Sequence, residues 1–124
     1  MKRTVLVIDD DGDILQMIKV MLDDAGYDVI SVGDARHGLS KLESRPVDLV
    51  ITDIIMPEME GIEFIMKLKE NIPSMPIIAI SGGGQLHSAD FLSFAQKLGA
   101  SAVLAKPFRR EKLLATVSKL LSTP

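Results

Sequence analysis

The stretch VLVIDDDGD, residues 5–13, places four apolar residues directly before a run of aspartates. Residues 5–8 form the kind of continuous apolar run that is typical of a strand buried on both faces of a parallel sheet. Two carboxylates about 4 Å apart repel each other by roughly 4 kcal/mol at an effective dielectric constant near 20. The aspartates must therefore share a cation or point away from one another.

The same alternation of a short apolar run with a helical pattern continues along the chain. Further strands are predicted over residues 27–32, 47–52, 77–80 and 102–105. A helical spacing of apolar residues follows each strand, with Gly26 placed to end the first helix and Asp34 and Ser88 placed to cap later ones. This order predicts a doubly wound (βα)₅ fold, an α/β three-layer sandwich in which helices cover both faces of a five-stranded parallel sheet.

Length and composition narrow the class of protein. The 124 residues are 47% hydrophobic, which is enough for one domain with a hydrophobic core over residues 1–124. Because only a three-residue tail follows the last predicted helix, we expect no output domain in this chain. The absence of cysteine excludes disulfides and thiolate chemistry. A net charge of −3 and the lack of a long apolar segment predict a cytoplasmic protein that binds neither nucleic acid nor membrane directly.

Chemistry-bearing residues stand at the ends of the predicted strands, where ligands of open α/β sheets bind. Asp9 and Asp10 follow the first strand, Asp53 the third, Ser81 the fourth and Lys106 the fifth. Three carboxylates at one edge need a cation, and oxygen ligands without His or Cys favour Mg²⁺ or Mn²⁺. A carboxylate beside Mg²⁺ can attack phosphorus and form an aspartyl phosphate. The Lys106 ammonium and the Ser81 hydroxyl could then bind the phosphoryl oxygens.

Together these residues resemble the receiver domain of bacterial two-component response regulators, of the single-domain CheY-like type, over essentially the whole chain. The resemblance rests on the Asp9-Asp10 pair and on Asp53 in the stretch DIIMPEMEG, residues 53–61. It rests equally on Ser81 after a buried strand and on KPF, residues 106–108, after GASAVLA. The resemblance implies a flavodoxin-like strand order, 2-1-3-4-5.

The resemblance also implies a magnesium site. Asp10 would ligate Mg²⁺ directly and Asp9 largely through water. Asp53 and the backbone carbonyl of Ile55 would be further ligands.

A phosphorylation switch is the implied function. Asp53 would accept a phosphoryl group from a phosphohistidine of a sensor histidine kinase or a histidine phosphotransfer protein. Ser81 and Lys106 would contact the phosphate, and the Lys106–Pro107 peptide would be cis, an isomer that proline permits. The phosphorylated domain would bind a downstream protein, not identified by the sequence, through the helix that Ser88 caps, the strand over residues 102–105 and the helix that follows this strand.

One residue departs from the family pattern. Members usually carry Tyr or Phe where this chain has Val103. Signalling is therefore expected to rely on the loop after the fourth strand, where glycines 82–84 permit unusual backbone angles. An ordinary flexible turn is the alternative interpretation of these glycines.

Three other functions are compatible with parts of the sequence. An aspartate-nucleophile phosphatase would normally need a cap insertion, for which 124 residues leave no room. A pseudo-receiver would act as an interaction module without phosphorylation, but the intact acidic set and Lys106 argue against it. Flavin binding is disfavoured by an aromatic content of 4%.

Asp11 and Asp13 are interpreted separately, as solvent-facing groups at a helix N-terminus, where negative charge is favourable.

Overall fold

The five strands of this protein run parallel in the order β2-β1-β3-β4-β5, as expected from the resemblance. A computed structural model describes residues 2–54, 61–82, 93 and 95–122. The elements are β1 (Thr4–Ile8), α1 (Gly12–Asp24), β2 (Asp28–Val32), α2 (Ala35–Ser44), β3 (Leu49–Asp53), α3 (Gly61–Asn71), β4 (Ile77–Gly82), β5 (Ala102–Lys106) and α5 (Arg110–Ser122). The predicted (βα)₅ class is therefore confirmed.

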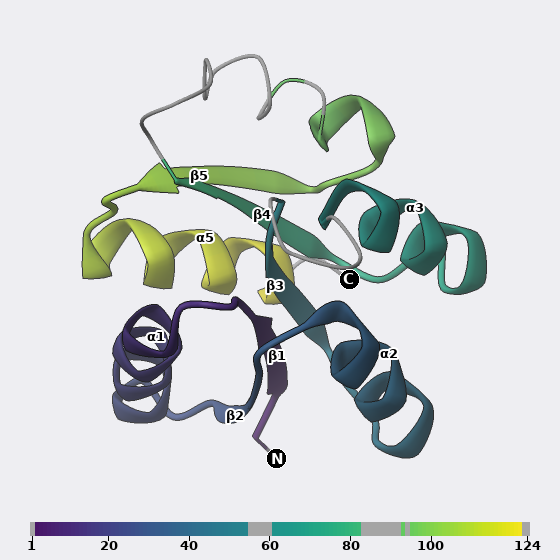
Figure 1. Ribbon diagram of the computed structural model, residues 1–124. Helices are drawn as coiled ribbons and strands as arrows, with labels where there is room; N and C mark the ends of the chain where they lie inside the picture. Colours follow the sequence, from purple (N-terminus) through teal and green to yellow (C-terminus); the bar gives the residue numbers. More distant parts are fainter. Residues whose placement is uncertain (1, 55–60, 83–92, 94, 123–124) are drawn as a thin grey trace.

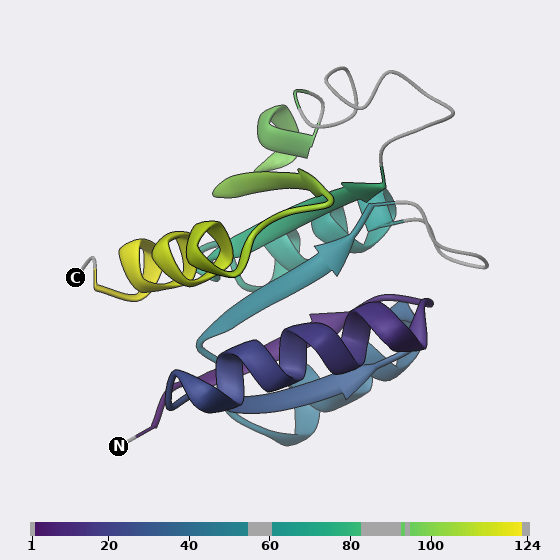
Figure 2. The same cartoon turned by 90° about the vertical axis from the view of Figure 1, so that its left-hand side faces the viewer.

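Helices cover the sheet on both sides, with α1 and α5 on one face and α2 and α3 on the other (Figures 1 and 2). Successive strand residues point to opposite faces of the sheet, so β1 contributes side chains to the hydrophobic core on each face. Val5 and Val7 pack with apolar residues of α1 and α5. Leu6 and Ile8 pack instead with α2 and α3, where Phe64 is fully buried. Burial on both faces explains why the strands have continuous apolar sequences.

Helix ends follow the local signals in the sequence. Asp11 is the N-cap of α1 and accepts hydrogen bonds from the backbone of Asp13 and Ile14, so its predicted place at a helix N-terminus is confirmed. Asp34 caps α2 through the backbone N–H of His37. Gly26 has a φ of +96°, the left-handed conformation that ends helices and suits glycine.

Strand boundaries differ slightly from the predicted ones. β3 starts at Leu49 rather than at residue 47, and Asp48 before it accepts a hydrogen bond from the backbone N–H of Thr4 through its carboxylate at 2.8 Å. β4 and β5 each run further than predicted, since pairing continues through Ser81 with Ala105 and through Gly82 with Lys106. The register therefore carries β5 to the edge where the candidate site lies.

Some predictions fall on residues that the structure does not describe. The helix predicted around Phe91 is helical at the described residues 93 and 95–98, while its proposed cap Ser88 lies outside them. Gly83, Gly84 and Ile55 also lie outside the described residues. Among the described helices, none is long and apolar enough to cross a membrane.

Candidate functional site

The candidate site lies at the carboxyl edge of the sheet, where the strands that carry the predicted site residues end. Asp9 and Asp10 follow β1, Asp53 is the last residue of β3 and Lys106 is the last residue of β5. Because β4 separates β3 from β5, the side chain of Lys106 reaches across the sheet edge to the acidic residues. The parallel arrangement thus gathers residues that are far apart in the sequence.

Lys106 contacts two of the acidic residues. Its Nζ donates to Oδ2 of Asp9 at 2.9 Å and to Oδ2 of Asp53 at 3.3 Å. The side chain of Asp9 is completely buried and that of Asp53 is 9% exposed. The other oxygen of Asp9, Oδ1, accepts from the backbone N–H of Asp11 at 2.9 Å. Both oxygens of the buried Asp9 carboxylate therefore have hydrogen-bond donors.

The neighbouring carboxylates raise the pKa of Lys106. Burial alone would lower the pKa of its ammonium, but the hydrogen bond from Lys106 to Asp9 and the charges of Asp53 and Asp9 outweigh burial. The pKa of Lys106 is therefore held above its ordinary value, and the residue stays positively charged at neutral pH.

The three carboxylates are close enough to hold a metal ion. One oxygen from each of Asp9, Asp10 and Asp53 lies within 4.8 Å of the others, with Asp10 exposed and the other two residues buried. With three carboxylates against one ammonium, the formal charge of the cluster is −2, which matches a divalent cation. An all-oxygen donor set with an exposed side suits Mg²⁺, which keeps several of its waters.

Ser81 lies on the same edge. It is 1% exposed in β4 and is paired in the register with Ala105, the residue that precedes Lys106. The strand order therefore places this hydroxyl-bearing residue between the strands that carry Asp53 and Lys106. Of the predicted site residues, only Ile55 lies outside the described part of the chain.

Comparison with known proteins identifies the family. The family model of the response regulator receiver domain matches residues 5–118. This chain belongs to that family. A curated relative of the receiver domain, the alkaline phosphatase synthesis transcriptional regulatory protein PhoP of Bacillus subtilis, is 29% identical over 98% of this chain and 49% of its own length. The transcriptional regulatory protein FixJ of Bradyrhizobium diazoefficiens is 32% identical, with 97% of this chain and 57% of its own length covered.

Solved receiver structures agree with the fold. The chemotaxis protein CheY4 of Vibrio cholerae is 32% identical and has a TM-score of 0.86, with 98% of this chain and 100% of that chain covered. The receiver domain of NtrX from Brucella abortus is 28% identical with a TM-score of 0.91, over 97% and 99% of the two chains. The receiver domain described here spans about half or less of the first curated relatives it matches.

Two features of the site were missed by the sequence analysis. The bond between Lys106 and Asp9 was not expected, because Lys106 was assigned only to the phosphate. Thr52, which is fully buried immediately before Asp53, was also not singled out. The sequence could have indicated Thr52, because it is the hydroxyl-bearing residue at the end of the otherwise apolar run LVIT, residues 49–52.

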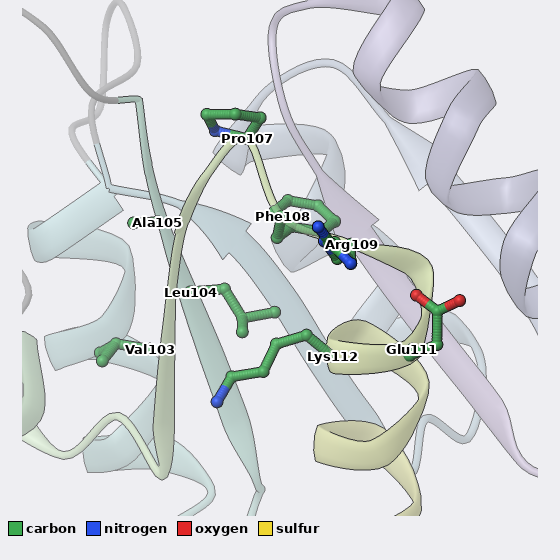
Figure 3. Close-up of a pocket in the computed structure, with 8 residues that line it drawn as sticks. All are labelled: Val103, Leu104, Ala105, Pro107, Phe108, Arg109, Glu111 and Lys112. Atoms are coloured by element: carbon green, nitrogen blue, oxygen red, sulfur yellow. The ribbon is translucent and has the colours of Figure 1, made fainter.

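A groove of about 630 Å³ runs along β5 and the start of α5, near Val103. Figure 3 shows Val103 and Leu104 leaving β5 on opposite sides and Phe108 beside Arg109 at the start of α5. The lining residues are Val103, Leu104, Ala105, Pro107, Phe108, Arg109, Glu111 and Lys112. Pro107 also lines this groove, and the peptide between Lys106 and Pro107 is cis as expected.

Proposed function

We propose that this receiver domain is the phosphoacceptor switch of a two-component system or phosphorelay and that Asp53 is the residue phosphorylated. The observation that carries the proposal is the position of Asp53, 3.3 Å from the Lys106 ammonium and within the three-carboxylate cluster. In the proposed step, a carboxylate oxygen of Asp53 attacks the phosphorus of a partner's phosphohistidine. The new P–O bond forms as the P–N bond breaks, and the electron pair of that bond returns to the imidazole ring.

Positioning and charge neutralisation by the chain's own residues would carry this transfer. Lys106 and Ser81 bind the phosphoryl oxygens in this proposal. Asp9, Asp10, Asp53 and the backbone carbonyl of Ile55 are the groups that would hold Mg²⁺ or, in its place, Mn²⁺. When bound, the ion supplies positive charge against the phosphoryl oxygens.

Phosphorylation would redistribute the hydrogen bonds of Lys106. A phosphoryl group adds about one further negative charge and new acceptor oxygens next to the ammonium. Lys106 is shared between Asp9 and Asp53 in the unphosphorylated domain. Its stronger attraction to the phosphoryl group would pull β5 and its flanking segments toward the site, which is how the signal would reach a partner surface.

The groove along β5 and α5 is the proposed surface for the downstream partner, together with the helix predicted around Phe91. Arg109 and Lys112 place two positive charges in its lining against one negative charge from Glu111, although the chain as a whole carries −3. Pro107 and the partly exposed Phe108 add apolar surface. An acidic protein segment with apolar side chains would complement this lining. The domain would act in the cytoplasm as a regulatory module without turnover of its own and without direct contact to nucleic acid.

Incubation with acetyl phosphate and Mg²⁺, followed by intact-mass measurement, tests the proposal. We expect one added phosphoryl group in the wild type and none in Asp53→Asn or without Mg²⁺. An unlabelled wild type, or a label that persists in Asp53→Asn, would contradict the assignment of Asp53. Continuous hydrolysis of a generic phosphate ester would instead indicate a phosphatase.

The partner surface has its own test once phosphorylation is established. Lys112→Glu should weaken binding of a cognate partner, because it reverses a charge in the groove. Lys67→Glu, the same change on the exposed surface of α3, is the matched control and should have no effect. Equal binding by both variants would place the partner elsewhere.

A further inference from the structure

We infer that Thr52 and Gly61 are positioning residues for Asp53. Together they fix the peptide group that joins Asp53 to Ile54 and therefore the direction in which the Asp53 carboxylate leaves β3. The inference rests on the proposed role of Asp53 as phosphoacceptor and concerns two residues outside the set of Asp9, Asp10, Asp53, Ser81 and Lys106.

Thr52 supplies a hydroxyl that packing does not need. Its side chain is completely buried and lies on the same face of β3 as Val50 and Ile54, which belong to the apolar core beneath α3. Its Oγ1 donates to the backbone carbonyl oxygen of Asp53 at 3.0 Å. Valine has nearly the same shape and no hydroxyl to remove from water. The hydrogen bond to Asp53 is therefore the specific contribution of threonine here.

The other end of the same peptide group is also held. The backbone N–H of Ile54 donates to the carbonyl oxygen of Ile80 on β4 at 3.0 Å. The carbonyl of Asp53 and the N–H of Ile54 belong to one planar unit, so bonds at both ends oppose its rotation. The last pairing of β3 is thus continued one residue beyond the end of the strand.

Gly61 packs closely against the same peptide group. It is the first residue of α3, and a Cβ atom added to it would overlap the carbonyl oxygen of Asp53 and the Cα of Ile54. These are backbone atoms, which cannot move aside as the end of a flexible side chain can. Any residue with a side chain at position 61 would therefore displace the peptide that follows Asp53.

The clamped peptide controls the geometry of the site. The Asp53 carboxylate must remain within reach of Lys106 and of the oxygens of Asp9 and Asp10. Ile55, the expected carbonyl ligand of the metal, comes one residue after the clamped unit. Small displacements of such groups reduce metal affinity and transfer rates strongly.

Thr52→Val and Thr52→Ser test the inference, with the wild type alongside. We expect Thr52→Val to stay folded with a modest fall in melting temperature, because the carbonyl of Asp53 loses a donor, while its affinity for Mg²⁺, measured by calorimetry, falls about tenfold. Its phosphorylation rate with acetyl phosphate should fall to a similar extent, and Thr52→Ser should restore both values. Thr116→Val, which removes a hydroxyl bonded to the carbonyl of Lys112 in α5, is the matched control and should change neither.

Unchanged Mg²⁺ affinity in Thr52→Val, with or without a lower melting temperature, would overturn the inference by showing a structural role alone. A loss of affinity that Thr52→Ser does not reverse would overturn it as well. Failure of the wild type to take up a phosphoryl group would refute the proposed function instead, while the Mg²⁺ measurement would still decide the role of Thr52. Gly61→Ala is a second variant, for which we expect the same loss of affinity.

Discussion

The ammonium of Lys106 lies 2.9 Å from a carboxylate oxygen of Asp9, a residue 97 positions earlier in the chain. The same ammonium lies 3.3 Å from Asp53, so one cation lies against two acidic residues at the edge of the sheet. The sequence posed the question of what offsets the repulsion among the aspartates. Lys106 is one part of the answer in the protein itself, and a divalent cation would offset the rest.

Replacing Lys106 by methionine should lower the free energy of unfolding by about 2 kcal/mol without Mg²⁺, because the buried Asp9 carboxylate then loses its charged donor. Urea denaturation measures the change. The loss should be smaller in saturating Mg²⁺, since the metal would neutralise the same carboxylates.

A double variant checks that explanation. Asp9→Asn removes the charge that Lys106 compensates, so Lys106→Met should cost less in the Asp9→Asn background than in the wild type. Equal losses in both backgrounds would mean that Lys106 stabilises the fold through packing rather than through its charge.

Mg²⁺ should stabilise the folded domain. At a free concentration ten times the dissociation constant, we expect about 1.4 kcal/mol of added stability, visible as a higher melting temperature. Asp10→Asn should lose most of this gain, because it removes the exposed carboxylate of the cluster. If Mg²⁺ does not change the melting temperature of the wild type, these residues do not form a metal site.

Asp34 should make stability depend on pH in the acidic range. The hydrogen bond from the backbone N–H of His37, followed by that from its ring, lowers the pKa of Asp34 below its ordinary value of 3.8. A carboxyl whose pKa is lower in the folded state stabilises the fold above the unfolded value and loses this effect as pH falls through the folded value. Asp34→Ala should therefore melt earlier than the wild type at neutral pH, and the difference should shrink below pH 3.8.

Asp34→Asn is the matched control, since asparagine caps helices without a charge. It should retain most of the stability at neutral pH but lose the acid dependence that belongs to residue 34. The same acid dependence in Asp34→Asn would assign the effect to other carboxylates.

Gly38→Ala should destabilise the protein even though alanine is the better helix former by about 1 kcal/mol. A Cβ at position 38 would lie 2.5 Å from Cδ1 of the fully buried Ile8, and overpacking of this kind costs about 1–3 kcal/mol. Chemical denaturation should therefore show a net loss in the wild-type background. In an Ile8→Val background, which lacks Cδ1, the same change should be neutral or stabilising. A loss of equal size in both backgrounds would point away from Ile8.

Local patterns were sufficient for most of the fold. The strand over residues 5–8 was predicted correctly because residues buried on both faces leave a continuous apolar run, and Asp34 was recognised as a cap because its side chain can accept from the next helical turn. The start of β3 was placed two residues early, since Val47 continues the apolar pattern while Asp48 bonds to Thr4. That contact spans 44 positions, and no local pattern reports it.

The candidate site divides along the same line. By itself the sequence determined the residue types at the strand ends, because alternation and apolar runs show where each strand stops. Only the tertiary structure decided that Lys106 bonds to Asp9 as well as to Asp53, and that Thr52 and Gly61 enclose the peptide after Asp53. Such contacts depend on strand order, register and the approach of α3 to the sheet, which arise when the whole chain packs.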